Sequence, residues 1–455
     1  MKNQFIHIFK AVEPSEQVAF RHYISYFYGQ QKVVLNTFEQ AVQSIAINDE
    51  QGFLATVKND KKTLNDLSDL KKWLLEFLTI QEVKNNGPDA QFLTLQALQK
   101  RGLQGILSDK SKLLTQELAK NESPDIWLNL LKLRLNHADY FNTENEKMDD
   151  HQAHLEALLA QLDNFYISTK LRYSAELESR KNILKEVHNP KLLTEILSLI
   201  ETDNSLNPLI KSLYLPLLNL IKDKSETAYF ELKSFISKNP VHDPHEKLAV
   251  VLYLLNFTAQ RIAKGDSSYN NEYFDIAQMG LNQSVFTARG RFPTTTFNNI
   301  VNVAVHLKKC TWAKKFIRDW SIYLTPHDRF IASNLAEARI YFEERNFDAS
   351  MTLLEQIAKH KNVHYALQIR ILMARNYYEQ KQTPNLQNSH CDNLELYIRR
   401  NVKNDGLKES TLNFVKILRF LINKKPQKQV LKVLEKQEPT TLRAWLTEKT
   451  NELKP

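Results

Sequence analysis

A seven-residue pattern occurs twice in this chain. Residues 338–344 are ARIYFEE and residues 374–380 are ARNYYEQ, so the two copies start 36 positions apart (374 − 338). Each copy belongs to an apolar stripe with helical spacing. The first stripe is Ile331, Leu335, Ala338 and Phe342, and the second is Leu367, Ile371, Ala374 and Tyr378. A second apolar stripe over 347–358 follows the first copy, so the repeated unit is a helix, a short turn and another helix.

This period lies in the range of stacked helical repeat arrays. Looser copies of the unit precede it, over 297–323 and over 246–281. A single helix pair cannot bury its apolar face alone, and a stacked neighbour completes the core. The repeat therefore predicts an array of helix pairs in this half of the chain.

Glycine is scarce, with 9 residues in 455. We infer that turns with positive φ are few, which disfavours sandwiches, barrels and glycine-rich nucleotide-binding loops. Helical periodicity recurs through the rest of the chain, and no segment has a convincing strand pattern. The expected fold class is all-α, with roughly 18 to 21 helices.

Four residues of the repeat carry a resemblance to a known family. Ala338, Tyr341, Phe347 and Ser350 resemble the small and aromatic positions of the tetratricopeptide repeat (TPR). The chain departs from that pattern in its first helix, which has no Trp or Leu-Gly pair, at Asn362, where proline is usual, and in its period of 36 rather than about 34. The resemblance is clear over 330–380 and extends over 205–400. It implies a right-handed α-solenoid of stacked antiparallel helix pairs that serves as a protein-interaction scaffold.

Four regions are expected along the chain. They are an irregular N-terminal helical region (1–140), a helical connector (141–204), the TPR-like repeats (205–403) and basic C-terminal capping helices (404–455).

The repeated pattern also repeats two charges. Arg339 and Glu343 in the first copy correspond to Arg375 and Glu379 in the second, and each pair has i, i+4 spacing. One interpretation is two exposed ion pairs, each worth a few tenths of a kcal/mol. The other follows from the resemblance: both arginines face the inner surface of the array, where TPR proteins hold extended peptides, and bind carboxylates through charge-assisted hydrogen bonds.

Basic residues are concentrated near the C-terminus. Between Glu395 and Lys436 there are 11 Lys or Arg and four acids. The basic residues are Arg399, Arg400, Lys403, Lys408, Lys416, Arg419, Lys424, Lys425, Lys428, Lys432 and Lys436. This segment could bind an acidic partner or nucleic acid. Its basic residues alternate with a helical apolar stripe, so a solvated helix face explains the same pattern. We expect the solvated face, and we do not expect nucleic acid as the partner.

No catalytic motif occurs in the sequence. Two histidine pairs, His151 with His154 and His360 with His364, could place two metal ligands on one helix face, but no cysteine is near either pair. His390 precedes Cys391, yet neighbouring residues on a helix point about 100° apart. We expect solvent-exposed or capping histidines, an ordinary thiol, and no metal or cofactor.

The sequence therefore predicts a non-catalytic scaffold for an unknown protein or peptide. The alternatives are binding of nucleic acid or an acidic partner by the basic segment, and an enzyme whose site is assembled from distant helices. With two widely separated cysteines, no 18-residue apolar run and no apolar N-terminal leader, we expect a cytoplasmic protein that does not cross a membrane.

Overall fold

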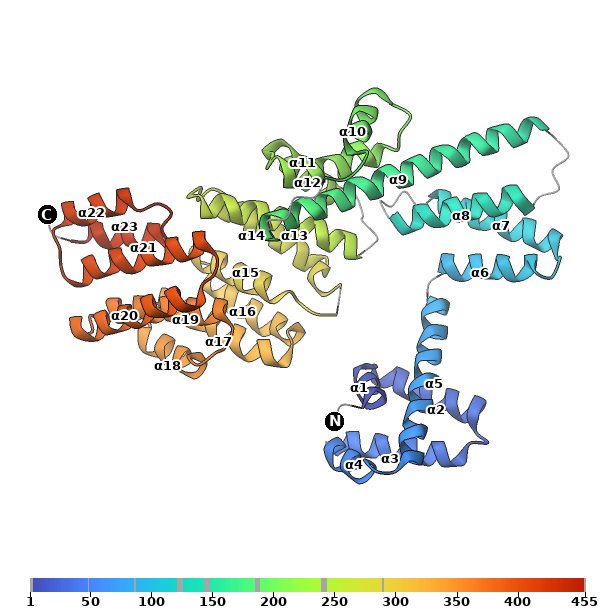
Figure 1. Ribbon diagram of the computed structural model, residues 1–455, viewed down its shortest axis with the longest axis horizontal. Coiled ribbons are helices and arrows are strands. Elements are labelled where there is room, and N and C mark those ends of the chain that lie inside the picture. Colours follow the sequence, from blue (N-terminus) through green and yellow to red (C-terminus); the bar gives the residue numbers. More distant parts are fainter. Residues whose placement is uncertain are drawn as a thin grey trace. The chain divides into compact units, whose positions relative to one another are not determined.

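The computed structural model describes residues 3–47, 49–85, 87–120, 126–142, 148–184, 189–238, 244–288 and 290–453. These residues form 23 α-helices and no strand, and helix accounts for 83% of the structure (Figure 1). The all-α prediction is confirmed, with more helices than expected. None of the described helices is long and apolar enough to span a membrane.

The chain divides into two compact units, which we describe separately. The N-terminal unit extends to residue 165, and the C-terminal unit begins at residue 166. The division falls inside α9 (Met148–Leu184), a helix that lies in the expected connector.

The N-terminal unit packs around an aromatic core. Phe38 on α3 contacts Phe5 and Phe9 on α1 and Phe20 on α2, with ring centroids 5.7–6.2 Å apart. A second cluster of buried leucines, including Leu114 and Leu135, joins α6, α7 and α8. The helices of this unit before α9 are α1 (Gln4–Ala11), α2 (Pro14–Tyr28), α3 (Lys32–Ala46), α4 (Glu50–Thr56), α5 (Lys61–Asn85), α6 (Gly87–Gln99), α7 (Gln104–Lys120) and α8 (Ile126–Asn142).

The C-terminal unit begins with the second part of α9 and continues through fourteen further α-helices. They are α10 (Leu193–Thr202), α11 (Leu215–Lys222), α12 (Glu226–Lys238), α13 (Pro244–Ala263), α14 (Tyr269–Asn282), α15 (Thr294–His306), α16 (Cys310–Trp320), α17 (Pro326–Glu343), α18 (Phe347–Ile357), α19 (Val363–Glu379), α20 (Pro384–Asn401), α21 (Asp405–Ile422), α22 (Gln427–Lys436) and α23 (Arg443–Asn451).

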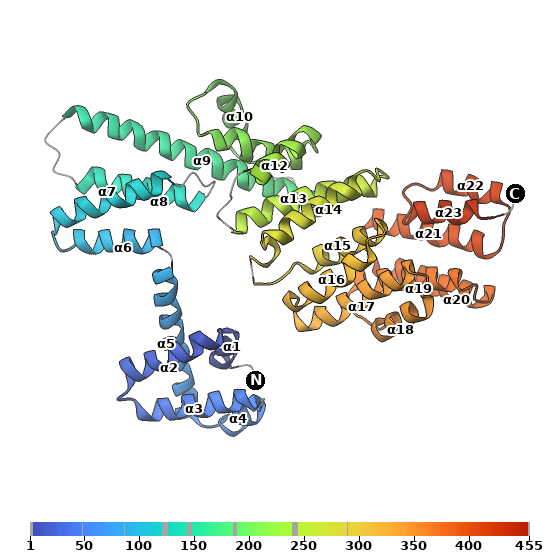
Figure 2. The same cartoon turned by 180° about the vertical axis from the view of Figure 1, so that it is seen from behind.

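Successive helices of this unit pack against one another from α11 to α21. In addition, α15 contacts α17 and α17 contacts α19, so every second helix also lies beside its counterpart (Figures 1 and 2). The last helix, α23, packs against both α21 and α22. The side chains that project from α15, α17 and α19 on one face can therefore meet.

The repeated stripes lie in the core as the sequence predicts. Ile331, Leu335, Ala338 and Phe342 are buried on α17, and Leu367, Ile371 and Ala374 are buried on α19. At Ala338 the helix pair approaches closely, because the Ser350 hydroxyl on α18 donates a 2.8 Å hydrogen bond to the Ala338 carbonyl. A larger residue at either position would separate the two backbones.

Four of these helices end in the same backbone motif. Lys308, Arg345, Lys381 and Lys424 follow α15, α17, α19 and α21, and each has a left-handed φ between 49° and 61°. After each, the next N–H bonds to a carbonyl five positions back, as from Asn346 to Tyr341 at 2.8 Å. Basic residues thus occupy a position that usually favours glycine. Eight non-glycine residues have positive φ in the part of the chain that the structure describes, so basic residues supply this conformation where glycine is scarce.

Candidate functional site

A groove with a volume of about 560 Å³ lies in the C-terminal unit. Its walls come from α13, α14, α15, α17, α18, α19 and α23, together with the turns after α15 and α17. We call it the Arg375 groove. Consecutive helix pairs contribute the ends of α15, α17 and α19, and α23 closes one side. The groove is therefore formed by several helix pairs together and not by any one of them.

Three of the six residues predicted to bind a partner line this groove. They are Glu343 at the end of α17, and Arg375 and Glu379 on α19. Arg339 lies about one turn before Glu343 on α17, and its positive charge helps to lower the pKa of Arg375. Arg399 and Arg400 lie elsewhere, on α20, where Arg400 lines a separate cavity of about 410 Å³.

The two i, i+4 ion pairs do not form. Glu343 pairs instead with Lys308, which follows α15. Glu379 pairs with Lys449 on α23 at 3.1 Å, and the indole N–H of Trp445 donates to the same carboxylate at 3.1 Å. The interpretation as two intrahelical ion pairs is therefore wrong, because partners from other helices take both carboxylates.

Arg375 consequently forms no ion pair with a carboxylate of any described residue. Its guanidinium carbon lies 4.1 Å from the centre of the Phe342 ring and 5.1 Å from that of Trp445. These contacts are cation–π distances. The Nε atom is buried and has no hydrogen-bond partner. Burial lowers the pKa of Arg375 to about 10, with the charge of Glu379 opposing this shift and the charge of Arg339 adding to it.

Arg339 is held in a similar way. Its Nη2 donates to the Gln368 side chain at 2.5 Å, while its buried Nη1 has no partner. Burial lowers the pKa of Arg339 to about 10 as well. Both arginine side chains are half-buried, and each keeps one buried nitrogen without a partner among the described residues. This is uncommon, because desolvation of a charged group without a carboxylate is costly. The two corresponding arginines of neighbouring repeats share this uncommon state.

Sequence reasoning missed Lys308, Trp445 and Lys449, which complete the groove. Trp445 and Glu379 are 66 residues apart, and α23 lies outside the repeat pattern that identified the other residues. The spacing of the repeated pattern therefore gave no information about the residues of α23.

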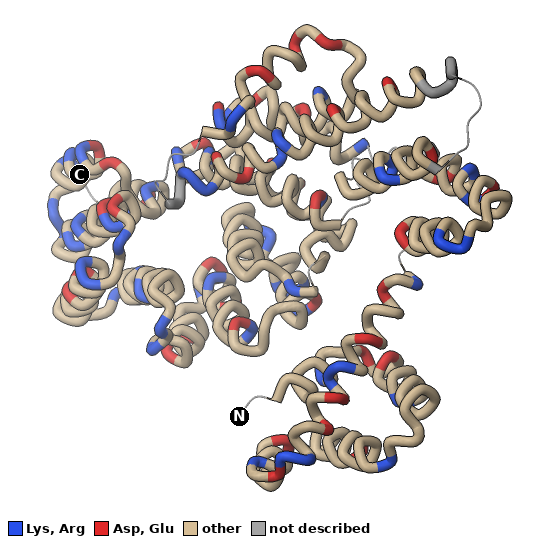
Figure 3. The backbone as a smooth tube through the Cα atoms, turned by 45° about the vertical axis from the view of Figure 1, so that its right-hand side comes forward, with Lys and Arg blue, Asp and Glu red and all other residues tan. Residues whose placement is uncertain are grey.

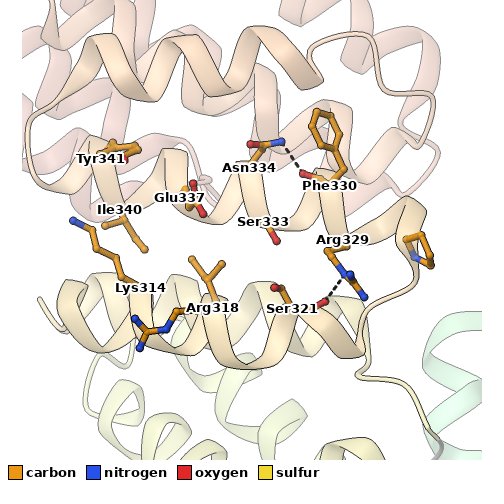
Figure 4. Close-up of a pocket in the computed structure, with 12 residues that line it drawn as sticks. Lys314, Arg318, Ser321, Arg329, Phe330, Ser333, Asn334, Glu337, Ile340 and Tyr341 are labelled. Carbon is orange, nitrogen blue, oxygen red and sulfur yellow. Dashed lines mark hydrogen bonds between the residues drawn. The ribbon is translucent and has the colours of Figure 1, made fainter. Parts of the chain in front are cut away.

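A larger trough of about 700 Å³ runs between α16 and α17. Figure 4 shows Lys314 and Arg318 on one side of it and Phe330, Asn334 and Glu337 on the other. Two of its basic groups already have partners within the fold: Lys314 pairs with Glu344 at 2.7 Å, and Arg329 donates to the Ser321 carbonyl at 3.0 Å. This trough therefore presents less uncompensated charge than the Arg375 groove.

The basic segment presents lysines to solvent, and one of its aromatic residues, Phe414, is fully buried. Seven of its lysines are exposed and take part in no ion pair among the described residues: Lys403, Lys416, Lys424, Lys425, Lys428, Lys432 and Lys436. Figure 3 shows basic positions along these C-terminal helices. Arg399 pairs with Glu395 at 2.7 Å, and Phe414 is buried. The buried ring of Phe414 is therefore not free to stack on a nucleic-acid base.

The remaining candidates for chemistry are structural. Cys391 is buried, and burial raises the pKa of its thiol to about 12. His390 Nε2 lies 2.9 Å from the Arg370 carbonyl and is engaged there. Among the described residues there is no group of three or more His, Cys, Asp or Glu that could hold a metal ion, and the His151 side chain lies outside them.

Comparisons with protein-family models, with curated proteins and with solved structures found no match to this chain.

Proposed function

We propose that this chain is a non-catalytic scaffold built from a right-handed TPR-like solenoid, and that it binds a protein or peptide in the Arg375 groove. The single observation that carries the proposal is the groove itself, to which α15, α17 and α19 contribute equivalent ends. A surface made by consecutive repeats is the feature through which helical arrays bind extended ligands. We also propose a cytoplasmic location, consistent with two free cysteines, one of them buried.

Filling the groove tests this proposal. Asn302 is exposed on α15 and lines the groove, so Asn302→Trp adds bulk there. Gln356 on α18 is exposed outside the groove, and Gln356→Trp is the matched control. In affinity capture from a lysate of the source organism, followed by mass spectrometry, proteins retained by the wild type should be lost from the Asn302 variant and kept by the control. Unchanged capture by both variants would contradict the groove as the binding site.

A second candidate function is binding of an acidic partner or nucleic acid by the basic segment. The observation that favours it is the set of seven exposed lysines that form no ion pair with any described residue. Replacing Lys424, Lys425, Lys428 and Lys432 with Gln separates the two candidates. Loss of the captured proteins, or of an oligonucleotide bound at about 150 mM salt, would favour the basic segment over the groove.

A third candidate is an enzyme with a site assembled from distant helices. Converging histidines and free carboxylates in a closed pocket would favour it. In the Arg375 groove the carboxylates of Glu343 and Glu379 are each bonded to a lysine, which favours the scaffold instead.

A further inference from the structure

The charges that line the Arg375 groove do not balance. Its three carboxylates belong to Glu343, Glu379 and Glu448. Lys308 pairs with the first, and Lys449 pairs with the other two at 3.1 Å each. Two further cations line the groove, Arg345 and Arg375, and no ion pair among the described residues involves either.

Arg375 is the better placed of these two cations. Arg345 is exposed to solvent, which compensates its charge. The Arg375 guanidinium contacts the rings of both Phe342 and Trp445, and these contacts hold it in place before any ligand arrives. A guanidinium held in place loses less side-chain entropy when it binds a planar oxyanion.

Arg339 strengthens the positive potential at this point. It occupies the equivalent position one repeat earlier, also lacks a carboxylate, and repels Arg375. Two desolvated like charges destabilise each other unless an anion lies near both. The groove therefore has a deficit of one negative group at Arg375.

We propose that the ligand of this groove carries an oxyanion, a carboxylate or a phosphate, that pairs with Arg375 while Arg339 adds to the attraction. The inference rests on the proposed function and specifies the chemistry of its ligand. Arginine binds either group through two parallel N–H···O hydrogen bonds, which a lysine cannot reproduce. Carboxylates and phosphates remain to be distinguished by experiment.

Two probes distinguish the sources of the oxyanion. One is inorganic phosphate, and the other is the peptide acetyl-Glu-Glu-Glu-amide, each titrated into the full chain with ionic strength held constant by NaCl. Binding is measured by isothermal calorimetry and by the rise in melting temperature that a ligand of the folded state produces. We expect at least one probe to bind, and which one binds identifies the oxyanion.

Four variants assign the binding to Arg375. Arg375→Gln should weaken the bound probe about tenfold or more, since hydrogen bonds to a charged group are lost. Arg375→Lys should give an intermediate loss, because the charge remains and the paired geometry does not. Arg339→Gln should reduce affinity less than Arg375→Gln. Arg101→Gln, which removes an exposed arginine of the N-terminal unit, should leave affinity unchanged.

Binding of neither probe, or binding that Arg375→Gln and Arg375→Lys both leave unchanged, would overturn the inference. Circular dichroism checks that each variant is folded, and Arg375→Lys provides the test if Arg375→Gln does not fold. The proposed function can survive this failure. If Asn302→Trp still abolishes protein capture while no probe binds, the groove binds a partner without an oxyanion.

Discussion

Lys449 is buried to an unusual degree for a lysine, with 3% of its side chain exposed. Its ammonium group contacts the carboxylates of Glu379, Glu448 and Glu452 at 2.8–3.1 Å. Burial acts to lower the pKa of Lys449, but these hydrogen bonds outweigh it and raise the pKa above its ordinary value. One residue of α23 thus neutralises a groove carboxylate and anchors its own helix.

Removal of this ammonium should destabilise the chain. Lys449→Ala leaves Glu379 without a cation in a partly buried position, and we expect a loss of about 3 kcal/mol in the free energy of unfolding. Urea unfolding measures this loss of free energy. The control is Lys436→Ala at an exposed lysine, which should change the free energy of unfolding by less than about 0.5 kcal/mol. Because the folded pKa is raised, the contribution is complete below the unfolded pKa of about 10.4 and declines only as pH rises above it. Equal stability of the two variants would contradict this role.

The sequence could identify Glu343, Arg375 and Glu379 because the repeat places them at equivalent positions. It could not identify their partners. Local spacing favours an i, i+4 pair, yet such exposed pairs are worth only a few tenths of a kcal/mol. The ion pairs with Lys308 and Lys449 depend on tertiary packing and outweigh that local preference. The local sequence gives no indication of these two partners.

At the scale of the helix, the repeated left-handed residues are the feature with the clearest energetic consequence. Lys381 ends α19 with a φ of 54° and is exposed. A residue with a Cβ atom pays about 1 kcal/mol or more in this conformation. A basic side chain at a helix C-terminus recovers part of that cost by interacting with the helix dipole.

Two substitutions separate the backbone from the charge. Lys381→Gly and Lys381→Ala both remove the charge, but only glycine relieves the strain. We expect the glycine variant to be more stable than the alanine variant by about 1 kcal/mol. Thermal unfolding followed by circular dichroism measures the difference, and identical melting temperatures would show that the turn relaxes at no cost.

Helix positions were largely predictable, because apolar spacing and proline both mark them. Pro244 and Pro326 begin α13 and α17, as their sequence context indicates. Pro216 lies in the first turn of α11, directly after a π-helix over Ile210–Tyr214. The helix ends were less predictable. Scarce glycine suggested few left-handed residues, whereas lysine and arginine take that conformation here.

At the scale of the whole molecule, each unit has its own hydrophobic core. The separate cores determine which unit is destabilised by a core substitution. Phe38, 1% exposed, packs against three phenylalanines of the N-terminal unit. Phe414 is buried in a cluster formed by α19 to α23 in the C-terminal unit. The solenoid geometry of the second unit and the boundaries of the predicted regions stay predictions.

Truncation of each phenylalanine should affect its own unit. Phe38→Ala should cost about 3–5 kcal/mol and should raise amide hydrogen exchange before residue 165. Phe414→Ala should do the same in α19 to α23. Faster exchange in α13 to α21 of the Phe38 variant would instead show that both units unfold as one cooperative body.

The lysines and the arginine with left-handed φ are also potential trypsin cleavage sites, and they are spaced about one repeat apart. Lys308, Arg345, Lys381 and Lys424 are exposed at turns, and trypsin cleaves after these residue types. Exposed turns are preferred sites of nicking in folded proteins. Cleavage at Lys308, Arg345 and Lys381 would release fragments of 37 and 36 residues (345 − 308 and 381 − 345). A brief digest analysed by intact mass should therefore show a ladder with steps one repeat long, whereas cuts scattered within α17 or α19 would show that the helices open before their turns do.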